Sequence, residues 1–401
     1  MSSVNTVSLY SVSAHMIGVT LVSAYACSPD AGSEAGAGWH SLRAALDVSR
    51  EVVLITQSSN VRGIESALPE ADCERVKIVG IDLGKGARAL RARVPFARYV
   101  YYFFWQMRLA REAKRLERQT DISVALHATF ASDWLWSGLA RLRQTPVVWG
   151  PVGGVSRTPA RLWRFLGVRG VAGELSRRSF QGLFRWVVDR QFARKVRLVL
   201  AQNEDVAERF AASSEVIVLP NAAIEVGDQQ WQGEQSDYVV GVGRLVAWKG
   251  WRLAIEALAQ TDEQIRLRIF GRGPELHSLE KLARRLGISH RVELGNHVPR
   301  ETLLEELSGA RALLHTSFHD ACAWSVAEAL TIGVPVIALD LAGPAVLLRG
   351  SGCHPIDSQS ENLVGSIAAA LVDPPSGTTT DIWRAEVYRR RLGELLVRAA
   401  R

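Results

Sequence analysis

The feature of this sequence that most limits its fold is the alternation of short, continuous apolar runs with segments of helical periodicity. Apolar runs without polar alternation are typical of strands that are buried on both faces, as in parallel sheets. Helices are expected between them, for example at Trp39–Val48, Trp251–Gln260, Pro274–Leu286 and Cys322–Ile332. The alternation predicts an α/β protein built from βαβ units. The predicted strands are Ile17–Ala24, Glu51–Thr56, Val76–Asp82, Ile122–His127, Pro146–Trp149, Leu198–Ala201, Val216–Leu219, Tyr238–Val242, Ile265–Phe270, Arg291–Leu294, Ala312–Thr316 and Val334–Leu339.

One segment interrupts this alternation. Asn221–Asp237 is polar and free of periodicity, so we expect an interdomain linker there. A chain of 401 residues also favours two domains over one. We therefore predict two Rossmann-like, doubly wound parallel-sheet domains at residues 1–222 and 223–378, followed by a basic helix in residues 379–401. Such domains bind ligands beyond the carboxyl ends of their strands, so functional residues are expected in a central cleft that both sheets face.

Composition narrows the class of protein. A hydrophobic content of 47% with 22% charged residues predicts a folded chain with a sizeable core and excludes fibrous and disordered classes. No apolar stretch reaches the roughly 18 residues of a membrane-spanning helix.

Residues 16–24 are similar to a secretory leader, but no Lys or Arg precedes Arg43, so we expect a buried strand. Four widely spaced cysteines predict neither a disulfide framework nor a zinc site and suit the cytoplasm.

The net charge of +7 is concentrated in the first half of the chain. Residues 1–200 carry 28 Lys and Arg against 15 Asp and Glu, whereas residues 201–401 carry 20 against 26. The excess lies in Arg88–Arg118 and Arg161–Arg197, where aromatic residues are interleaved. Two interpretations stay open: these segments lie on an anionic membrane surface, or the aromatic residues are core and the arginines a solvated face. Nucleic acid is not expected as a partner, because no nucleic-acid-binding motif is present.

A glycine-rich loop follows the first predicted strand and leads into a helix. Gly32, Gly36 and Gly38 fall in this loop. Glycines before a helix N-terminus let a phosphate approach backbone N–H groups, and the helix dipole favours its charge. The alternative is a tight turn without a ligand.

Two cations mark a strand-to-helix junction in the second half. Arg244 and Lys249 lie five residues apart, between flanking glycines. From there both can reach one pyrophosphate, the arginine as a bidentate fork and the lysine as a point charge. The alternative is a pair of surface cations in ordinary salt bridges.

Two acids lie eight residues apart at the start of a predicted helix, Asp320 and Glu328. On a continuous helix they would be about 12 Å apart, too far to share one proton or one metal ion. They are suited to bind opposite ends of a hydroxyl-rich ligand, because carboxylates accept hydrogen bonds from vicinal hydroxyls. Ser325 and the helix N-terminus would face phosphates between them. The alternative is a helix-capping Asp and a surface Glu.

A histidine ends one of the apolar strands. His127 lies on the expected cleft side, near the glycine-rich segment 149–154. It is either a functional residue or a hydrogen-bonded core histidine.

Together these segments resemble the family-4 retaining glycosyltransferases of the B-type (GT-B) fold, over nearly the whole chain. The resemblance rests on motifs that keep the order of that family. They are Cys27-Ser-Pro and Gly32-Ser-Glu-Ala-Gly-Ala-Gly-Trp39, His127, Trp149-Gly-Pro-Val-Gly-Gly154, Arg244 with Lys249-Gly250, Phe270-Gly-Arg-Gly-Pro-Glu275, the acid pair, and Asp340-Leu-Ala-Gly-Pro344. The first and third motifs are similar to the subgroup that acts in bacterial exopolysaccharide and glycoconjugate assembly.

The resemblance implies a role for each matching residue. It places Arg244 and Lys249 on the donor diphosphate, Glu328 on the ribose hydroxyls and His127 near the transferred sugar. The implied donor-binding residues are Gly36, Gly38, Arg244, Lys249, Gly271, Gly273, Asp320, Ser325 and Glu328, and the implied catalytic residues are His127, Asp320, Arg244 and Lys249. Three residues depart from the family pattern and change the expected sugar contacts: Asp320 replaces Glu, and Cys322 and Ala323 replace glycines. The last helix is expected to pack on the N-terminal domain.

The implied function is retaining, hexosyltransferase-like transfer from a nucleotide-diphosphate sugar to a hydroxyl acceptor. The acceptor would be lipid-linked or a glycan, with the protein cytoplasmic or peripheral on the inner face of the membrane. No DxD motif occurs, so we expect neither a metal nor another cofactor. Three alternatives stay open: a soluble small-molecule acceptor, a degenerate nucleotide-sugar-binding homologue that acts through a partner, and a nicotinamide-dependent oxidoreductase. The last lacks a clean GxGxxG and an acid after Glu51–Thr56.

Overall fold

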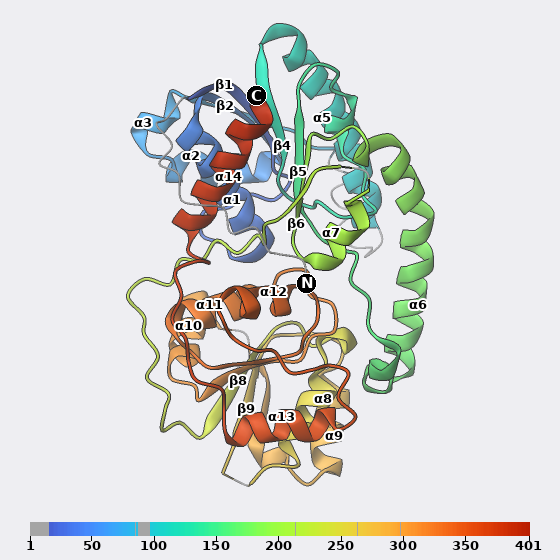
Figure 1. Ribbon diagram of the computed structural model, residues 1–401, viewed down its shortest axis with the longest axis vertical. Coiled ribbons are helices and arrows are strands. Elements are labelled where there is room, and N and C mark those ends of the chain that lie inside the picture. The colour runs from blue at the N-terminus through green and yellow to red at the C-terminus, as the bar shows by residue number, and fades with distance from the viewer. Residues whose placement is uncertain (1–15, 85, 87–96, 213, 263, 297) are drawn as a thin grey trace.

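The strands form two parallel sheets, stacked along the long axis of the molecule (Figure 1). The computed structural model describes residues 16–84, 86, 97–212, 214–262, 264–296 and 298–401. The first sheet has the order β3-β2-β1-β4-β5-β6-β7, and the second the order β10-β9-β8-β11-β12. The strands are β1 Ile17–Ser23, β2 Ser49–Thr56, β3 Val76–Gly80, β4 Ile122–His127, β5 Val147–Val152, β6 Leu198–Ala201, β7 Val216–Val218, β8 Tyr238–Val242, β9 Arg266–Phe270, β10 Val292–Asn296, β11 Ala312–His315 and β12 Val336–Ala338.

Helices cover both faces of each sheet. The first sheet is covered by α1 Ser33–Val48, α2 Ser58–Ala67, α3 Glu70–Cys73, α5 Ala97–Gln119, α6 Trp163–Val188, α7 Glu204–Phe210 and α14 Ala385–Ala400. The second is covered by α8 Trp251–Leu258, α9 Leu276–Arg285, α10 Arg300–Ser308, α11 Trp324–Ile332, α12 Ala342–Gly350 and α13 Leu363–Val372.

All the predicted strands are present, and β1 shows why their apolar runs are continuous. Leu21 and Val22 are fully buried, and they belong to core clusters on opposite faces of the sheet. Successive side chains of a strand point to opposite faces, so a strand that is covered on both sides needs an apolar residue at every position. Asn221–Asp237, predicted as a linker, contains no helix or strand in the described chain.

The helix starts are less well predicted. The first helix begins at Ser33 rather than Trp39, so Gly36 and Gly38 lie inside it. A Cβ on Gly36 would lie 2.2 Å from the Ala31 carbonyl oxygen, and one on Gly38 would lie 2.1 Å from that of Ala26. These glycines therefore let the helix pack against the preceding loop, which outweighs their low helix propensity.

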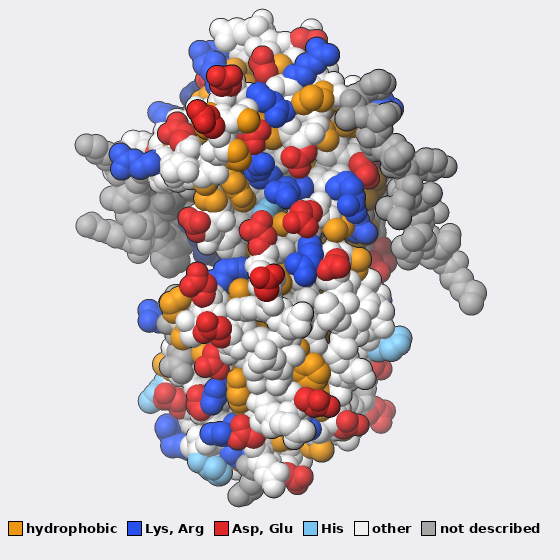
Figure 2. All heavy atoms as spheres, turned by 90° about the vertical axis from the view of Figure 1, so that its left-hand side faces the viewer, with side chains coloured by type: hydrophobic (Ala, Val, Ile, Leu, Met, Phe, Trp, Pro, Cys, Tyr) orange, Lys and Arg blue, Asp and Glu red, His pale blue; other side chains and the backbone are white. Residues whose placement is uncertain are grey.

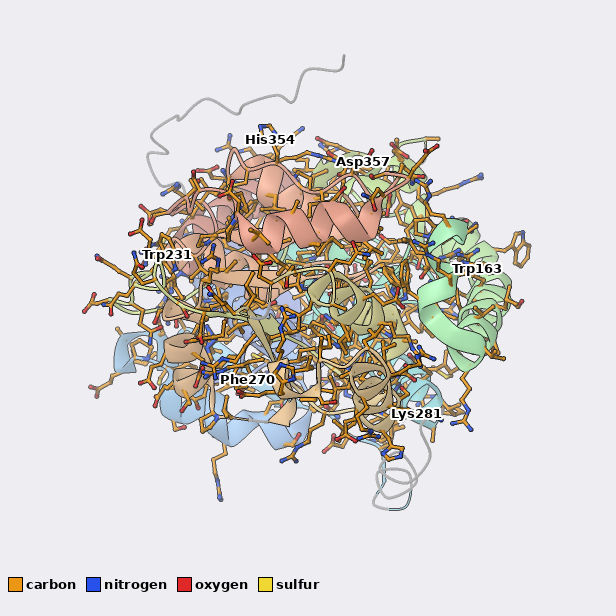
Figure 3. The ribbon with its side chains drawn as sticks, turned by 90° about the horizontal axis from the view of Figure 1, so that it is seen from below. Trp163, Trp231, Phe270, Lys281, His354 and Asp357 are labelled. Carbon is orange, nitrogen blue, oxygen red and sulfur yellow. The ribbon has the colours of Figure 1, made fainter. Side chains whose placement is uncertain are left out.

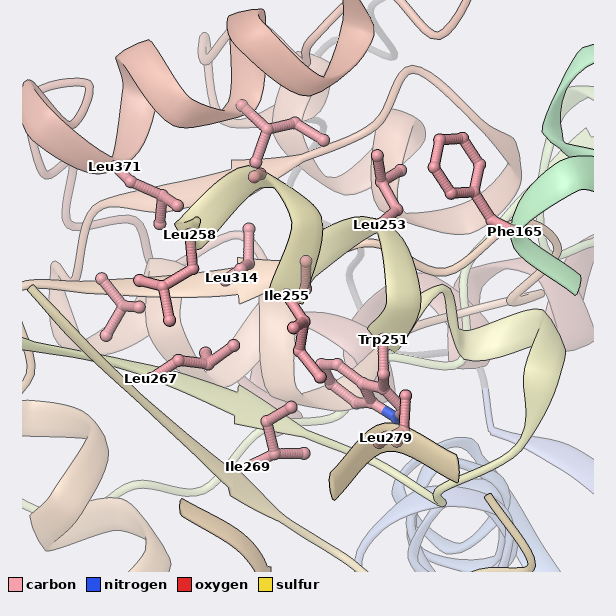
Figure 4. Packing of buried hydrophobic residues seen from close by; sticks show 14 of the residues in the cluster. Phe165, Trp251, Leu253, Ile255, Leu258, Leu267, Ile269, Leu279, Leu314 and Leu371 are labelled. Carbon is pink, nitrogen blue, oxygen red and sulfur yellow. The ribbon is translucent and has the colours of Figure 1, made fainter. Parts of the chain in front are cut away.

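Trp251 is the centre of the core of the second domain. It is 2% exposed and packs beside Ile255, Ile269 and Leu279 (Figure 4). Its indole Nε1 donates to the Arg244 carbonyl oxygen at 2.9 Å. The core of this domain thus fixes the loop that carries Arg244.

Two helices link the domains. The first turns of α6, where Trp163 lies (Figure 3), run beside the second domain, and Phe165 is buried in the core of that domain (Figure 4). The last helix, α14, returns to pack along α1 (Figure 1). Leu392 and Leu396 on α14 are fully buried and share a cluster with Leu42.

In the basic aromatic segments, some side chains belong to the core and others lie on the surface. Residues 88–96 of the first segment lie outside the described residues. On α5, Tyr102 and Trp105 are buried, whereas Phe103 and Phe104 are 51% and 49% exposed. The core interpretation therefore holds for the buried side chains, and the membrane interpretation stays a prediction for the exposed ones. No described helix is long and apolar enough to span a membrane. On the face shown in Figure 2, basic and acidic side chains are interspersed.

The packing of α14 predicts a stability effect. Leu392→Ala removes a fully buried side chain and should lower the free energy of unfolding by about 2–5 kcal/mol. Arg390→Ala, on the exposed face of the same helix, should leave it nearly unchanged. Urea unfolding followed by tryptophan fluorescence measures both, and equal midpoints for the two variants would contradict the packing.

Candidate active site

Arg244 and Lys249 are brought together around an indole ring. They follow β8, at the carboxyl edge of the second sheet. The Arg244 Cζ lies 5.4 Å and the Lys249 Nζ 5.1 Å from the centroid of the Trp248 ring. Trp248 in turn stacks on His319 at 4.6 Å. The predicted pairing of these two cations is thus a property of the fold.

The Gly271–Gly273 segment packs backbone to backbone against the Arg244 loop. A Cβ on Gly271 would lie 2.0 Å from the Gly243 carbonyl oxygen, and one on Gly273 would lie 2.2 Å from that of Leu245. The Leu245 N–H donates to the Arg272 carbonyl oxygen at 3.0 Å. Glycine is required at both positions by this close approach, so the two loops form one surface beside the cations.

Asp320 holds Lys249 in place. The Lys249 Nζ lies 2.5 Å from the Asp320 Oδ2, and the His315 Nε2 lies 2.9 Å from the same oxygen. Burial alone would raise the pKa of Asp320, but Lys249 and His315 outweigh it and hold that pKa well below its usual range. Asp320 is therefore ionised, and the shorter Asp side chain still reaches the lysine.

Arg244, in contrast, is exposed. Among the described residues, no acidic side chain forms a salt bridge with its guanidinium. Its charge is thus available to an anionic ligand, and Lys249 adds a second cation on the same indole ring.

Glu328 lies about one turn into α11 and is paired with an arginine that the sequence analysis missed. Both Arg300 Nη1 and Nη2 contact the Glu328 Oε1, at 2.9 and 2.8 Å. Arg300 also donates to the Glu225 carbonyl oxygen in the linker, at 3.0 Å. Nothing in the sequence around Arg300 distinguishes it from an ordinary residue at a helix start. Ser325 is buried in the first turn of the same helix.

The α1 loop differs from its expected geometry. Because Gly36 and Gly38 lie inside α1, their N–H groups belong to the helical hydrogen-bond ladder, and the free N–H groups are those of the first turn. That turn contains Glu34, whose carboxylate accepts a hydrogen bond from the Phe130 N–H. The expectation that Gly36 and Gly38 offer free N–H groups is therefore wrong in its geometry.

His127 is a buried, fully hydrogen-bonded residue. It is 2% exposed, and its ring nitrogens lie 3.2 Å from the Tyr102 hydroxyl and 2.8 Å from the Ser137 hydroxyl. Burial lowers its pKa to about 4, so it is neutral at pH 7. This geometry favours the core interpretation over a role at the transferred sugar.

A cavity of 430 Å³ lies between the domains, and we call it the Glu34 cavity. Residues of both domains line it, including Glu34 and Phe130 from the first and Asp320 and Cys322 from the second. The remaining lining residues are Ser33, Tyr99, Ala131, Ser132, Trp134, Leu135, Gly153, Gly154, Gln181, Gln202, Asn221 and Ala321. The predicted cleft is therefore present and opens beside the Lys249–Asp320 pair.

A second interdomain cavity, of 580 Å³, contains none of the predicted site residues. Some of its charged side chains are paired. Arg349 contacts Glu204 across the domain boundary at 2.8 Å, and Arg185 contacts the buried Asp133 within the first domain at 2.5 Å. The pair of Arg349 and Glu204 therefore joins the two domains beside this cavity.

The arrangement places the Lys249–Asp320 pair and the N-terminus of α11 beside the Glu34 cavity, with Arg244 on the same indole ring as the lysine. Such a set can hold a diphosphate and stabilise the charge that develops on it. In the described part of the chain, no group of three or more His, Cys, Asp and Glu side chains is placed to hold a metal ion.

Comparison with known proteins identifies the second domain. Residues 228–380 match the family described as glycosyl transferases group 1. The 2-deoxystreptamine glucosyltransferase of Streptomyces kanamyceticus is 29% identical over 109 residues, which are 26% of this chain and 28% of that protein. The lipopolysaccharide glucosyltransferase WaaG of Escherichia coli (strain K12) is 28% identical over 149 residues, 35% of this chain and 39% of that protein. Each match spans well under half of the relative.

Among solved structures, Anabaena HepE in complex with UDP and glucose matches with a TM-score of 0.55. Its sequence identity is 16%, over 95% of each chain. At that identity the likeness shows the fold alone. It confirms the predicted α/β architecture of two Rossmann-like domains, the B-type glycosyltransferase fold.

Glu328 predicts a pH effect on stability. Burial raises its pKa to about 7, although Arg300 acts in the opposite direction. An unfolded Glu titrates near 4.3, roughly its ordinary value, so the folded state binds more protons between these two pKa values. Stability contributed by this group therefore falls as pH rises through that window and is constant above it.

Glu328→Gln should remove this slope. We expect the melting temperature of the variant, relative to the parent, to be higher at pH 8 than at pH 5. Glu305→Gln, an exposed change on α10, serves as the control. Parallel pH curves for Glu328→Gln and the parent would contradict the raised pKa.

Proposed function

Because residues 228–380 form a glycosyl transferases group 1 domain, we propose that this chain is a retaining glycosyltransferase that needs no metal ion. It moves a sugar from a nucleotide-diphosphate sugar to a hydroxyl of an acceptor. The observation that carries the proposal is the pairing of Arg244 and Lys249 around Trp248, beside the Glu34 cavity. HepE, the structural relative with UDP and glucose bound, supports a nucleotide-sugar donor.

The two cations stabilise the leaving nucleoside diphosphate. The guanidinium of Arg244 binds two phosphate oxygens, and Lys249, oriented by Asp320, supplies a point charge to the same group. Because Asp320 already fixes the lysine, little reorganisation is needed as negative charge develops. Preorganised charge of this kind is usually the largest contribution to catalysis, and it takes the place of a metal ion.

Glu328 binds the ribose of the donor. Both Arg300 contacts are to the Oε1 of Glu328, which leaves Oε2 to accept from the ribose hydroxyls. Arg300 thereby orients the carboxylate, and Ser325 in the first turn of α11 lies about one turn away, towards the phosphates.

The reaction takes place on one face of the donor sugar. The bond between the anomeric carbon and the diphosphate oxygen breaks, and the acceptor oxygen forms its new bond on the same face. The leaving phosphate takes the hydroxyl proton of the acceptor, so charge and atoms balance without an enzymic nucleophile. Asp320 lies where it can accept from a hydroxyl of the transferred hexose.

Two acceptor classes fit the relatives. WaaG is a lipopolysaccharide glucosyltransferase, and the Streptomyces relative acts on a small soluble molecule, 2-deoxystreptamine. We propose polysaccharide or glycoconjugate assembly on the inner face of the membrane as the principal function. A soluble acceptor is the second candidate, and a degenerate homologue that only binds the nucleotide sugar is the third.

The surface of α5 supports the membrane proposal. Val100, Phe103, Phe104 and Met107 are exposed, and their spacing places them along one stripe of the helix. Arg108 and Arg111 are exposed at the following positions of the same stripe. Apolar side chains that are flanked by arginines match an anionic lipid surface, which would take the apolar stripe into its headgroup layer.

The role of Arg244 is tested by Arg244→Ala. Its side chain is exposed, and only its backbone carbonyl holds Trp251, so the variant should fold. We expect transfer or donor hydrolysis to fall by about 10²- to 10³-fold. Arg285→Ala, an exposed change at the end of α9, should leave turnover unchanged. Near-normal turnover by Arg244→Ala would refute the assignment.

The donor is identified by a thermal-shift panel of UDP, GDP, ADP, dTDP, their sugars and NAD, without added metal. A ligand that binds only the folded state raises the melting temperature by mass action. A shift with one nucleoside diphosphate supports the transferase, and a shift with NAD alone supports an oxidoreductase instead. Binding without turnover supports the degenerate homologue.

The membrane proposal is tested by liposome co-sedimentation. The parent chain should bind vesicles that contain anionic lipid, and binding should weaken at high salt. Replacing Phe103 and Phe104 by glutamate should abolish binding, whereas Leu286→Glu, an exposed change in the second domain, should not. If the double variant sediments like the parent, the stripe is not the membrane contact.

A further inference from the structure

The walls of the Glu34 cavity carry two kinds of side chain that suit a sugar ring. Tyr99 and Trp134 meet edge to face, with centroids 5.0 Å apart. Gln181, Gln202 and Asn221 add amide groups that can both donate and accept hydrogen bonds. Aromatic faces pack against the C–H face of a ring, and amides bind its hydroxyls. This inference rests on the proposed function and concerns the acceptor.

The oxygen of one of these amides has no hydrogen-bond partner among the described residues. Asn221 is 6% exposed, and its Oδ1 accepts no hydrogen bond. A buried amide oxygen without a partner costs free energy, and Asn221 lines the cavity. A hydroxyl or an ammonium group of a bound ligand would supply the missing donor.

The charged residues that line the cavity are a further feature of it. No Lys or Arg is among the described residues that line it, whereas Glu34 and Asp320 are. Three cations lie around it: Lys249 is paired with Asp320 at 2.5 Å and Arg177 with Glu174 at 2.9 Å, and Arg98 lies on the ring of Tyr99 and donates to its hydroxyl at 2.8 Å. The N-terminus of α1 favours an anion, and Glu34 lies in its first turn. Burial raises the pKa of Glu34, whereas the hydrogen bond from the Phe130 N–H acts in the opposite direction.

Glu34 is held at the wall of the cavity by a hydrogen bond. Its Oε1 accepts from the Phe130 N–H, and the side chain lines the cavity. An anionic ligand would meet two carboxyl groups and, among the described lining residues, no Lys or Arg. A neutral hydroxyl would donate to the carboxylate, and an ammonium group would pair with it.

We propose that the Glu34 cavity is the acceptor subsite and takes a hydroxylated ring without negative charge, neutral or ammonium-bearing. Glu34 is the residue that determines this specificity, and Tyr99 forms the apolar wall. The chemistry excludes uronates and phosphorylated rings from the subsite, although such groups can lie elsewhere on a longer acceptor.

Three probes with one ring shape test the proposal: glucose, glucosamine and glucuronate. Their binding is measured by ligand-observed NMR and calorimetry, with and without the nucleoside diphosphate that shifts the melting temperature. We expect glucose and glucosamine to bind at least tenfold more tightly than glucuronate. Equal or tighter binding of glucuronate, or no binding of any ring, overturns the proposal.

The Glu34→Gln variant removes the charge of this side chain and keeps its shape, so it tests the effect of the charge alone. The amide oxygen of Gln can still accept from the Phe130 N–H, so the loop should stay folded. In this variant the ratio of the dissociation constants of glucuronate and glucosamine should fall several-fold. Glu208→Gln, a matched change in the second cavity, should leave that ratio unchanged. Tyr99→Leu should weaken the binding of all three sugars by a similar factor. If Glu34→Gln leaves the selectivity between the sugars unchanged, the proposed role of Glu34 is overturned.

The two proposals fail in different ways. If a nucleoside diphosphate binds and the donor is hydrolysed but ring selectivity is absent, only the acceptor subsite is wrong. If no nucleotide binds and no donor is turned over, the transferase proposal is wrong, while selective ring binding by NMR would still support the subsite.

Discussion

The ion pair between Lys249 and Asp320 is the interaction on which the site depends. It joins the loop after β8 to the loop after β11, two neighbouring strands of one parallel sheet. Because parallel strands end at the same edge, residues far apart in the chain meet there. The pair fixes the lysine beside Trp248, whereas no acid of the described residues pairs with Arg244. A buried pair of this kind contributes orientation more than stability, since desolvation offsets much of its Coulomb attraction.

The second domain could not present this site to a cavity without the first. The beginning of α6 is buried in the core of the second domain, and α14 returns to pack on α1. Arg300 connects Glu328 to the linker, and Arg349 contacts Glu204 on the first domain. These contacts close the two sheets around the Glu34 cavity. The proposed donor and acceptor groups therefore come from the two domains that meet at this cavity.

Much of the fold was predictable from local patterns. Strands such as β1 and β8 were placed within a few residues, because a strand that is buried on both faces must be apolar throughout. Arg244, Lys249 and Asp320 were also identified, since each lies between a predicted strand and the helix that follows it. The start of α1 was missed because Gly36 and Gly38 are poor helix formers, and only their contacts with the Ala31 and Ala26 carbonyl oxygens explain their place in a helix.

The sequence by itself determined the two parallel sheets, the linker and the set of polar side chains at the strand ends, because hydrophobic periodicity and chain order encode these locally. The tertiary structure alone decided which of those side chains meet. His127 follows a strand like the others, yet Tyr102 and Ser137 enclose it in the core. Glu34 and Arg300 carry no local signal, and their roles arise from Phe130 and Glu328, which are distant in the chain. Burial and pairing depend on contacts between distant segments, and no local pattern specifies those contacts.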